Sequence, residues 1–508
     1  WDDLWPPDGN TSPGYDLEWR RFQSALVTDL LHWQAALVRE LARPDQFVTQ
    51  DFVAVHGRPE SDVFAIMRAL DVMAINPYHL TQDGLDLRPT TPRLYGAPEW
   101  MGSAATEPGV WRLYLNADFA RGVKERSFLV TELNALSIGG AHANYPAYDG
   151  QWRLVAYALI ARGATLIAYW HWHTLHYSNE TYWGGVLGHD LQPGRAYAEV
   201  QRIAAELRRH DALLTDLRPD AGVAFLYSQD SKYALEFQPA LARPGTNDPD
   251  PRTYGRVFDT FYQSFFEARA QAVVLHPEQT FAAYPVLVVP ALYIADEALL
   301  ARLVEYAQAG GHLLLTFRSG YADALGRIRW TRAPGPLRAA VGASYQEYSN
   351  LVTPLPLTAA AAGFDLPAGA RALAWADGLL LEGATPLAMY DHPHFGRFPA
   401  VVSQALGCGR VTYCGTLPNA ALGTALARWV LDQAGVRPPL TDLPAPVRVT
   451  AATAADGRRL LFVSNWSAVP QRIAHLALAG TELFTGAARV AGDALPLEPW
   501  DTRIIIAS

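Results

Sequence analysis

Two glutamates each follow an apolar segment that the sequence predicts to be a buried strand. Glu132 ends the run Phe128-Leu-Val-Thr-Glu132, and Glu180 lies in the polar and aromatic loop after residues 164–172. A helical segment, residues 151–162, separates the two strands, so the order is strand, helix, strand. In a parallel α/β barrel the carboxyl ends of the strands carry the chemistry. We therefore expect both carboxylates at the mouth of such a barrel.

Each glutamate also has a structural interpretation. A carboxylate at the end of a buried strand is costly unless it is paired or functional, so Glu132 could instead form a salt bridge or cap a helix. Glu180 lies among Asn179, Tyr182 and Trp183, together with Trp172. Such a mixture of acceptors and flat rings suits a hydroxyl-rich ligand, although the loop could also pack through its own aromatic rings. The residue types alone leave both interpretations open.

Histidines near the same strand raise the question of a metal. His171, His173 and His176 follow one another closely, but no cysteine or companion carboxylate motif accompanies them. Zinc is therefore disfavoured, and we predict no metal and no cofactor. Histidines that line a polyol site or pack in the barrel mouth fit the pattern better. Tyr78, in Asn76-Pro-Tyr78-His79, has the same character: it contacts a ligand or closes a turn after its strand.

Four strands alternate with helices in residues 1–215. Apolar residues recur at spacings of three and four through residues 16–42, which predicts a long amphipathic helix. Strands are predicted at 47–52 and 72–79, before the two already described, with helices at 61–70, 110–121 and 195–210. Such alternation predicts a parallel sheet. A closed barrel needs eight strands. The other four lie upstream of Trp1, or the sheet is open; a first residue other than Met favours a fragment.

Two further domains are predicted after the half-barrel. Residues 216–440 alternate strands and helices again, which indicates a doubly wound α/β domain of flavodoxin or amidotransferase type. An amidotransferase would need a cysteine on a sharp turn, but the candidate turn reads Thr316-Phe-Arg-Ser-Gly320. We therefore predict a structural role for this domain. Residues 441–508 contain only short alternating strands, which predicts a small antiparallel β-sandwich.

Composition narrows the classes of partner and compartment. The net charge is −9, which disfavours a nucleic-acid surface. Cys408 and Cys414 are the two cysteines, too few for a disulfide framework. No apolar run has the length of a membrane span, and no signal peptide is evident. We expect a cytoplasmic protein without a membrane partner.

The chain resembles the C-terminal part of glycoside hydrolase family 42, the microbial β-galactosidases. The resemblance rests on Phe47-Val-Thr-Gln-Asp-Phe52, on Thr131-Glu132, on Tyr169-Trp-His-Trp172 and on residues 179–189, Asn-Glu-Thr-Tyr-Trp-Gly-Gly-Val-Leu-Gly-His. The order of barrel, α/β domain and small β domain also matches. The resemblance implies a (β/α)8 TIM barrel of which the C-terminal half is present.

The resemblance also implies a mechanism and a site. Glu132 matches the nucleophile of a retaining β-galactosidase, and Glu180 matches the glutamate that binds galactose hydroxyls. Trp183 stands where many members have a histidine ligand, and Gly140 where many have a tryptophan. Trp172, His173 and Tyr78 complete the expected sugar site. The acid/base glutamate is expected upstream of Trp1. Members are commonly homotrimers, so a homotrimer acting on a small-molecule galactoside is expected.

Two alternatives stay open at this stage. One is an arabinopyranosidase of the same family, because that sugar is galactose without its hydroxymethyl group. The other is a non-catalytic carbohydrate-binding or scaffold fragment, because a retaining glycosidase needs two carboxylates about 5–5.5 Å apart and only the nucleophile is evident here.

Overall fold

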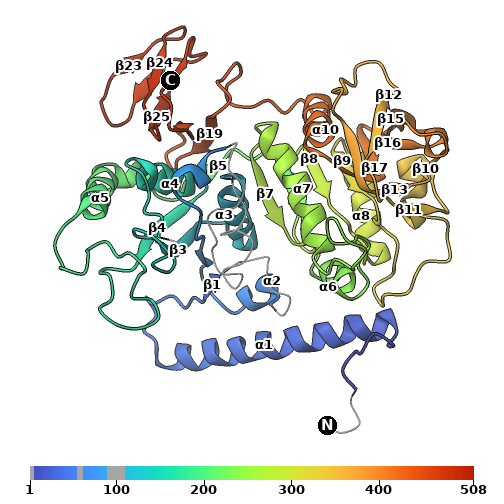
Figure 1. The fold of residues 1–508 in the computed structure, drawn as a ribbon, viewed down its shortest axis with the longest axis horizontal. Helices are drawn as coiled ribbons and strands as arrows, with labels where there is room; N and C mark the ends of the chain where they lie inside the picture. Colours follow the sequence, from blue (N-terminus) through green and yellow to red (C-terminus); the bar gives the residue numbers. More distant parts are fainter. Residues whose placement is uncertain (1–4, 54–60, 88–108, 143) are drawn as a thin grey trace. The chain divides into compact units, whose positions relative to one another are not determined.

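The computed structural model describes residues 5–53, 61–87, 109–142 and 144–508 (Figure 1). Contacts between residues divide the chain into two compact units. One unit comprises Trp1–Leu31, Pro59–Ile66 and Ala221–Arg437, and the other comprises His32–Arg58, Met67–Asp220 and Pro438–Ser508. Each unit is described separately below.

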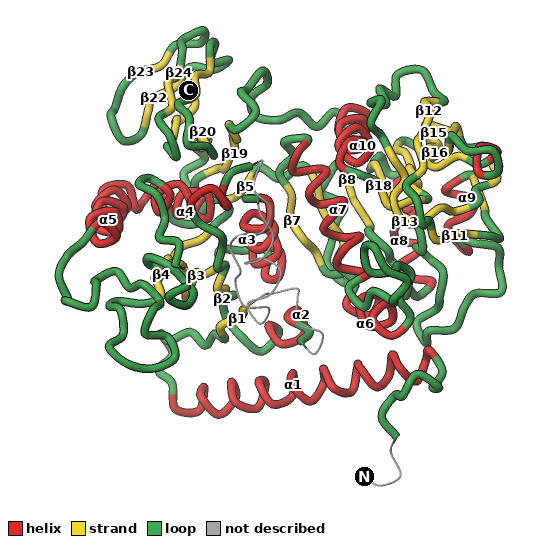
Figure 2. The backbone as a smooth tube through the Cα atoms, viewed as in Figure 1, coloured by secondary structure: helices red, strands yellow, loops and turns green. Residues whose placement is uncertain are grey.

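A four-stranded parallel sheet forms the centre of the second unit. Its order is β1-β2-β3-β4, and every neighbouring pair is parallel. Parallel neighbours need a crossover connection, usually a helix. α3 makes the connection between β2 and β3, and α4 makes the one between β3 and β4 (Figure 2). The predicted alternation of strands and helices is therefore confirmed. The elements are β1 (Asp51–Val53), β2 (Ala74–Asn76), α3 (Trp111–Lys124), β3 (Phe128–Asn134), α4 (Gln151–Ile160), β4 (Ala164–Trp170) and α5 (Arg195–Leu214).

The two ends of this sheet lack a second neighbour among the described strands. β1 pairs with β2 alone, and β4 pairs with β3 alone. On β4, Leu166 remains 42% exposed. Beside it, Ile160, Ile167 and Leu207 help to line an apolar depression of about 400 Å³ between β4 and α5. The second unit thus has an apolar surface next to an unpaired strand edge.

The predicted long helix is α1 (Pro13–Leu41), and its apolar stripe faces outward. Along this stripe Leu26, Trp33 and Leu41 are 54%, 61% and 86% exposed. Polar residues anchor the amino-terminal part of the helix in the first unit, where Arg20 pairs with Glu236 at 2.8 Å. Helical periodicity therefore located the helix correctly. None of the described helices has the length and apolar character needed to cross a membrane.

The first unit is built on a large mixed sheet. Its parallel part has the order β7-β6-β8-β9-β17, the 2-1-3-4-5 arrangement of a flavodoxin-like domain (Figure 1). An antiparallel extension continues from β17 through β16, β15, β12, β13 and β11, and the sequence did not predict these strands before β17. The parallel strands are β6 (Val223–Leu226), β7 (Ala272–Leu275), β8 (Val286–Val289), β9 (His312–Thr316) and β17 (Gly409–Cys414). The extension comprises β11 (Tyr348–Asn350), β12 (Leu355–Ala359), β13 (Arg371–Asp377), β15 (Thr385–Tyr390) and β16 (Pro399–Leu406).

Three longer helices of this unit agree with the predicted alternation of strands and helices, whereas α6 (Gln229–Phe237) and α9 (Arg338–Val341) were not predicted. The three are α7 (Thr253–Glu267), α8 (Glu297–Gln308) and α10 (Ala420–Gln433), within the residues 216–440 for which alternating strands and helices were predicted. α6 is nine residues long and is capped by the Ser228 hydroxyl, which accepts a hydrogen bond from the Ser231 amide. A further helix, α2 (Val63–Met67), lies within the predicted segment 61–70, and the Asp62 carboxylate accepts the Ala65 amide hydrogen at 3.0 Å.

The carboxy-terminal strands form the predicted small β domain. β19 (Val447–Thr453), β20 (Arg459–Asn465) and β25 (Thr502–Ala507) are antiparallel neighbours. Successive side chains of a strand point to opposite faces. Phe462 accordingly packs in one buried cluster with Tyr157 of α4, and Leu461 packs in another with Leu495. The side chains of β20 therefore pack into buried clusters on both faces of this sheet.

Candidate active site

The carboxyl ends of the parallel strands meet at one edge of the sheet in the second unit. Val53 pairs with Asn76 at the carboxyl ends of β1 and β2, and Val130 pairs with Ile75, so Thr131 and Glu132 of β3 lie at the edge where β1 and β2 end. The register between β3 and β4 is irregular between Val130 and Leu133, where Glu132 lies. Such irregularities re-aim side chains beside active sites. The sheet therefore gathers polar side chains from separate strands at one edge.

Glu132 is partly buried and is held by a tyrosine. The Tyr78 hydroxyl donates a hydrogen bond of 2.5 Å to Glu132 Oε2. No described residue donates a hydrogen bond to Glu132 Oε1. Asn134, two residues further along β3, brackets the backbone of His79 by accepting from its amide at 3.3 Å and donating to its carbonyl at 3.1 Å. The segment that carries Tyr78 is thus tied to the strand that carries Glu132.

Asp51 is a third carboxylate at this edge, and the sequence did not identify it. Its Oδ2 accepts a hydrogen bond of 2.7 Å from the Asn76 side-chain amide, and its Oδ1 accepts one of 2.7 Å from the Thr131 hydroxyl. Asp51 therefore connects three neighbouring strands directly beside Glu132. The sequence predicted a strand at 47–52, near whose end Asp51 lies, whereas the observed β1 begins at Asp51, so the strand-end rule did not identify this carboxylate.

The surroundings of Glu132 raise the pKa of its carboxyl group. Burial raises the pKa of Glu132, the Tyr78 hydrogen bond opposes this rise, and the negative charges of Asp51 and Glu180 add to it. Burial and the neighbouring Glu132 also raise the pKa of Tyr78 strongly, so this phenol stays protonated and acts as a donor. A half-buried carboxylate with a perturbed pKa and one free oxygen is a candidate functional group.

The loop after β4 is fixed against the loop after β3. The Leu136 amide donates to the Gly184 carbonyl at 3.0 Å, and the Gly184 amide donates to the Ser137 carbonyl at 2.8 Å. A Cβ at Gly184 would lie 2.6 Å from the Leu136 side chain, and one at Gly185 would lie 2.4 Å from the His173 backbone. Because only glycine permits such close approach, these two residues bring Glu180 within electrostatic range of Glu132.

The other predicted ligands lie on this loop. The Glu180 carboxylate makes no hydrogen bond or ion pair with another described residue. Trp172 is 60% exposed, with its ring 6.3 Å from that of Tyr197. Trp183 is partly buried and donates its amide hydrogen to the Glu180 carbonyl at 2.9 Å. These positions leave a carboxylate and an exposed indole on the loop that adjoins Glu132.

The histidines of the loop contact its backbone. His171 Nδ1 lies 2.6 Å from the His173 carbonyl, His173 Nδ1 lies 3.1 Å from the Thr174 carbonyl, and His176 Nε2 lies 2.8 Å from the His189 carbonyl. Within the described residues, no three histidine, cysteine, aspartate or glutamate side chains form a metal-binding group. The ring contacts stabilise the loop and leave one nitrogen of each ring for other partners.

Comparisons with known proteins match β-galactosidases along most of the chain. The family model described as beta-galactosidase matches residues 1–210, and the model described as beta-galactosidase trimerisation domain matches residues 221–437. A β-galactosidase of Halorubrum lacusprofundi is 31% identical over 446 residues, which cover 85% of this chain and 60% of the relative. One of Haloferax lucentense is 30% identical over 434 residues, with the same shares. The chain thus spans about 60% of the length of these relatives.

Solved structures show the same fold. A catalytic mutant of a GH42 β-galactosidase from G. stearothermophilus superposes with a TM-score of 0.85 at 22% identity, over 100% of this chain and 71% of that one. The structure of the Halorubrum lacusprofundi enzyme gives a TM-score of 0.79 at 28% identity, over 99% and 70%. The predicted fold class is therefore confirmed. Two consecutive family models and relatives along most of the sequence lead to one conclusion: the chain belongs to glycoside hydrolase family 42, the β-galactosidases.

Proposed function

We propose that this protein hydrolyses terminal β-D-galactosides with retention of configuration, and that Glu132 is the nucleophile. The observation that carries the proposal is the pairing of Glu132 Oε2 with the Tyr78 hydroxyl at 2.5 Å, which leaves Oε1 free for attack. In such a reaction Oε1 attacks the anomeric carbon, the bond to the leaving oxygen breaks, and an ester to Glu132 forms. Water then releases galactose and regenerates the carboxylate.

The neighbouring groups have distinct roles in this proposal. Tyr78 holds the nucleophile in place. Its hydroxyl can donate a hydrogen bond to Glu132 both when the carboxylate is charged and when it has become an ester. Glu180 accepts hydrogen bonds from galactose hydroxyls, while Trp172, His173 and Trp183 line the site. We assign the general acid to none of the described carboxylates, since Asp51 has both oxygens engaged.

We also propose that the protein acts in the cytoplasm as a homotrimer through residues 221–437.

Covalent trapping tests the assignment of the nucleophile. A 2-deoxy-2-fluoro-β-galactoside with a dinitrophenolate leaving group needs no proton donor, and the fluorine slows release of the sugar. Incubation is expected to add one fluorogalactosyl group, located by peptide mass spectrometry on Glu132. Label on another carboxylate would reject Glu132 as nucleophile. An unlabelled protein, with a related β-galactosidase labelled in parallel, would reject the glycosidase function for this chain.

Asp51 is expected to set the lower pH limit of activity. Its charge helps to raise the pKa of Glu132, and only the ionised nucleophile reacts. Replacing Asp51 by Asn removes that charge, so the pKa of Glu132 falls and the acidic limb of the kcat/KM profile moves to lower pH. A dinitrophenyl β-galactoside is the substrate of choice, because its leaving group needs no protonation.

A double exchange provides the control for this prediction. In the variant with Asp51→Asn and Asn76→Asp, the hydrogen-bonded pair and its negative charge are both retained. Its acidic limb is expected to return toward that of the parent protein. An acidic limb that stays in place in the Asp51→Asn variant would show that Asp51 has no electrostatic effect on the nucleophile.

A further inference from the structure

A fully exposed tryptophan lies on a loop of the first unit, residues 321–333. The side chain of Trp330 is fully accessible to solvent in the single chain, and Ile328, two residues earlier, is half-exposed. A single exposed apolar residue is ordinary, but tryptophan is the residue type most often found to dominate the binding energy of a protein interface. The surroundings of Trp330 therefore decide whether this side chain marks a contact surface.

Apolar side chains continue this surface on a neighbouring segment. β14 (Leu380–Leu381) leaves both of its leucines partly exposed. It pairs with β10 (Ala343–Ser344), and the next residue after β10, Tyr345, bridges to Ala333 at the end of the Trp330 loop. Two strand spacings amount to roughly 10 Å, so the exposed leucines lie close to the end of this loop. Apolar surface gathered in this way from separate segments is typical of a protein contact.

The loop holds Trp330 in a fixed position. On one side of Trp330, the Arg329 guanidinium pairs with Glu297 of α8. On the other side, the Ala333 carbonyl accepts the Tyr345 amide hydrogen at 2.9 Å. A side chain that is presented from a fixed backbone loses little conformational freedom when it binds a partner. The indole is thus already placed for a contact in the free chain.

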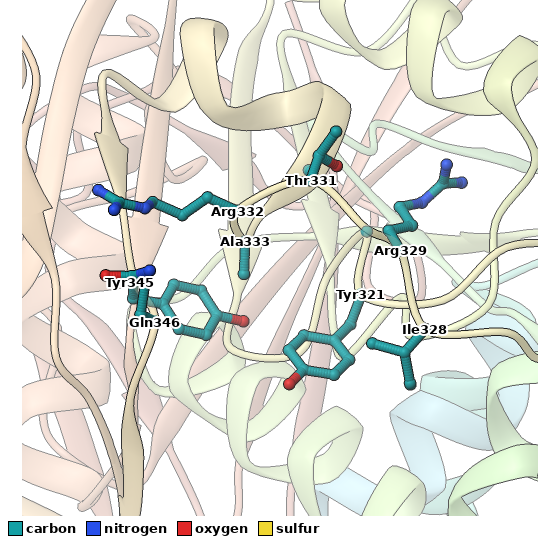
Figure 3. Close-up of a pocket in the computed structure, with 10 residues that line it drawn as sticks. Tyr321, Ile328, Arg329, Thr331, Arg332, Ala333, Tyr345 and Gln346 are labelled. Atoms are coloured by element: carbon teal, nitrogen blue, oxygen red, sulfur yellow. The ribbon is translucent and has the colours of Figure 1, made fainter.

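A cavity of about 220 Å³ opens beside the same loop. Figure 3 shows Ile328 next to the ring of Tyr321, with the ring of Tyr345 on the other side of Tyr321. The Arg318 guanidinium lies 4.5 Å from the ring centroid of Tyr321 and fixes this wall by a cation–π contact. Tyr345 is buried, and its hydroxyl is hydrogen-bonded to that of Tyr413. The two rings and Ile328 therefore offer mainly apolar surface.

The size of the cavity favours a single side chain as its occupant. Sites for small molecules typically have volumes of about 300–1,000 Å³, which is larger than this cavity. Trp330 does not line the cavity, although Arg329 and Thr331 on either side of it do, so the indole leaves the cavity open. A flat aromatic ring packs well against other rings and aliphatic groups. The loop thus carries an exposed indole beside an open cavity that suits such a ring.

We propose that Trp330 of one copy of this chain inserts into the cavity beside Tyr321 of a second copy, and that three such contacts close a ring. The indole and the cavity are different surfaces of one chain, so the contact is head-to-tail, and head-to-tail contacts form rings when the rotation closes. Both surfaces lie within residues 221–437, the segment assigned above to trimer formation. The inference rests on the proposed homotrimer and identifies the contact that holds it together.

Sedimentation velocity of the full chain over a dilution series tests this contact. The parent protein is expected to have three times the mass of one chain at high concentration. Trp330→Ser is expected to move the midpoint of dissociation to a concentration about thirtyfold higher or more, the effect of losing a dominant interface residue. Because Trp330 is fully exposed in the single chain, the far-ultraviolet circular dichroism of this variant is expected to be unchanged.

Trp5→Ser provides the matched control. Trp5 is also largely exposed, but it lies outside residues 221–437, so the trimer is expected to persist in this variant. A trimeric parent protein with unchanged association in Trp330→Ser, or with an equal loss in Trp5→Ser, would overturn the contact and leave the homotrimer standing. A parent protein that is monomeric or dimeric at every concentration would reject both, while labelling of Glu132 would still test the glycosidase reaction separately.

Mixing two variants tests the head-to-tail arrangement. Trp330→Ser keeps the cavity, whereas Ile328→Asp keeps the indole and places a carboxylate on the apolar wall of the cavity. Neither variant alone is expected to form the ring. Their mixture can still make one native contact, so native mass spectrometry is expected to show a pair containing one chain of each variant. Absence of this mixed pair would overturn the head-to-tail contact.

Discussion

Replacing Glu132 by Gln is expected to slow hydrolysis of an aryl β-galactoside by on the order of 10⁴-fold or more, the scale of losing a covalent nucleophile. Gln keeps the shape of the side chain and can still accept the Tyr78 hydrogen bond, so the fold is expected to persist. Its amide cannot form the glycosyl ester. Steady-state kcat/KM with a nitrophenyl β-galactoside and the thermal midpoint of the same samples measure the two effects.

A matched variant and a rescue experiment make this prediction specific. Glu199 on α5 is also a partly buried glutamate whose pKa is raised by burial, so Glu199→Gln controls for removal of a carboxylate and is expected to retain activity. In Glu132→Ala, added azide is expected to restore turnover and to give the galactosyl azide of inverted configuration. Full activity of Glu132→Gln would refute its role as nucleophile.

Replacing Arg162 by Met is expected to destabilise the second unit by about 3–5 kcal/mol, because it removes one partner of a fully buried ion pair. Arg162 and Asp118 are 2% and 1% exposed, and Arg162 approaches both Asp118 oxygens at 2.8 Å. The pair connects α3 with the end of α4 behind the sheet. Guanidinium-induced unfolding, followed by tryptophan fluorescence, measures the loss.

Two further variants distinguish burial of charge from loss of a contact. Arg195→Met removes the ion pair with Asp149, whose side chains are 44% and 76% exposed, and is expected to cost less than about 1 kcal/mol. The double variant Arg162→Met with Asp118→Leu removes both buried charges and is expected to recover most of the loss. A loss in Arg162→Met no larger than in Arg195→Met would contradict the prediction.

The sequence predicted the strand that carries Glu132 because its apolar run is long and ends abruptly in a carboxylate. The same reasoning missed Asp51, because β1 has only three residues. The role of Asp51 depends on its hydrogen bonds with Asn76 and Thr131, and only the register of the strands brings these residues together. Short strands such as β12 and β15 gave too little periodicity to detect, and the register between β15 and β16 is irregular. The roles of Glu180, Trp172, His173 and Trp183 in binding sugar stay predictions.

The apolar depression beside β4 affects how this protein must be assayed. Fluorescent dyes that report unfolding, such as anilinonaphthalene sulfonate, bind to exposed apolar surface. Leu166 and Ile167 offer such a surface in the native state. A dye-based melting curve is therefore expected to start from a high signal and to understate the transition. Intrinsic tryptophan emission, supplied by 15 indoles, is the better reporter of unfolding.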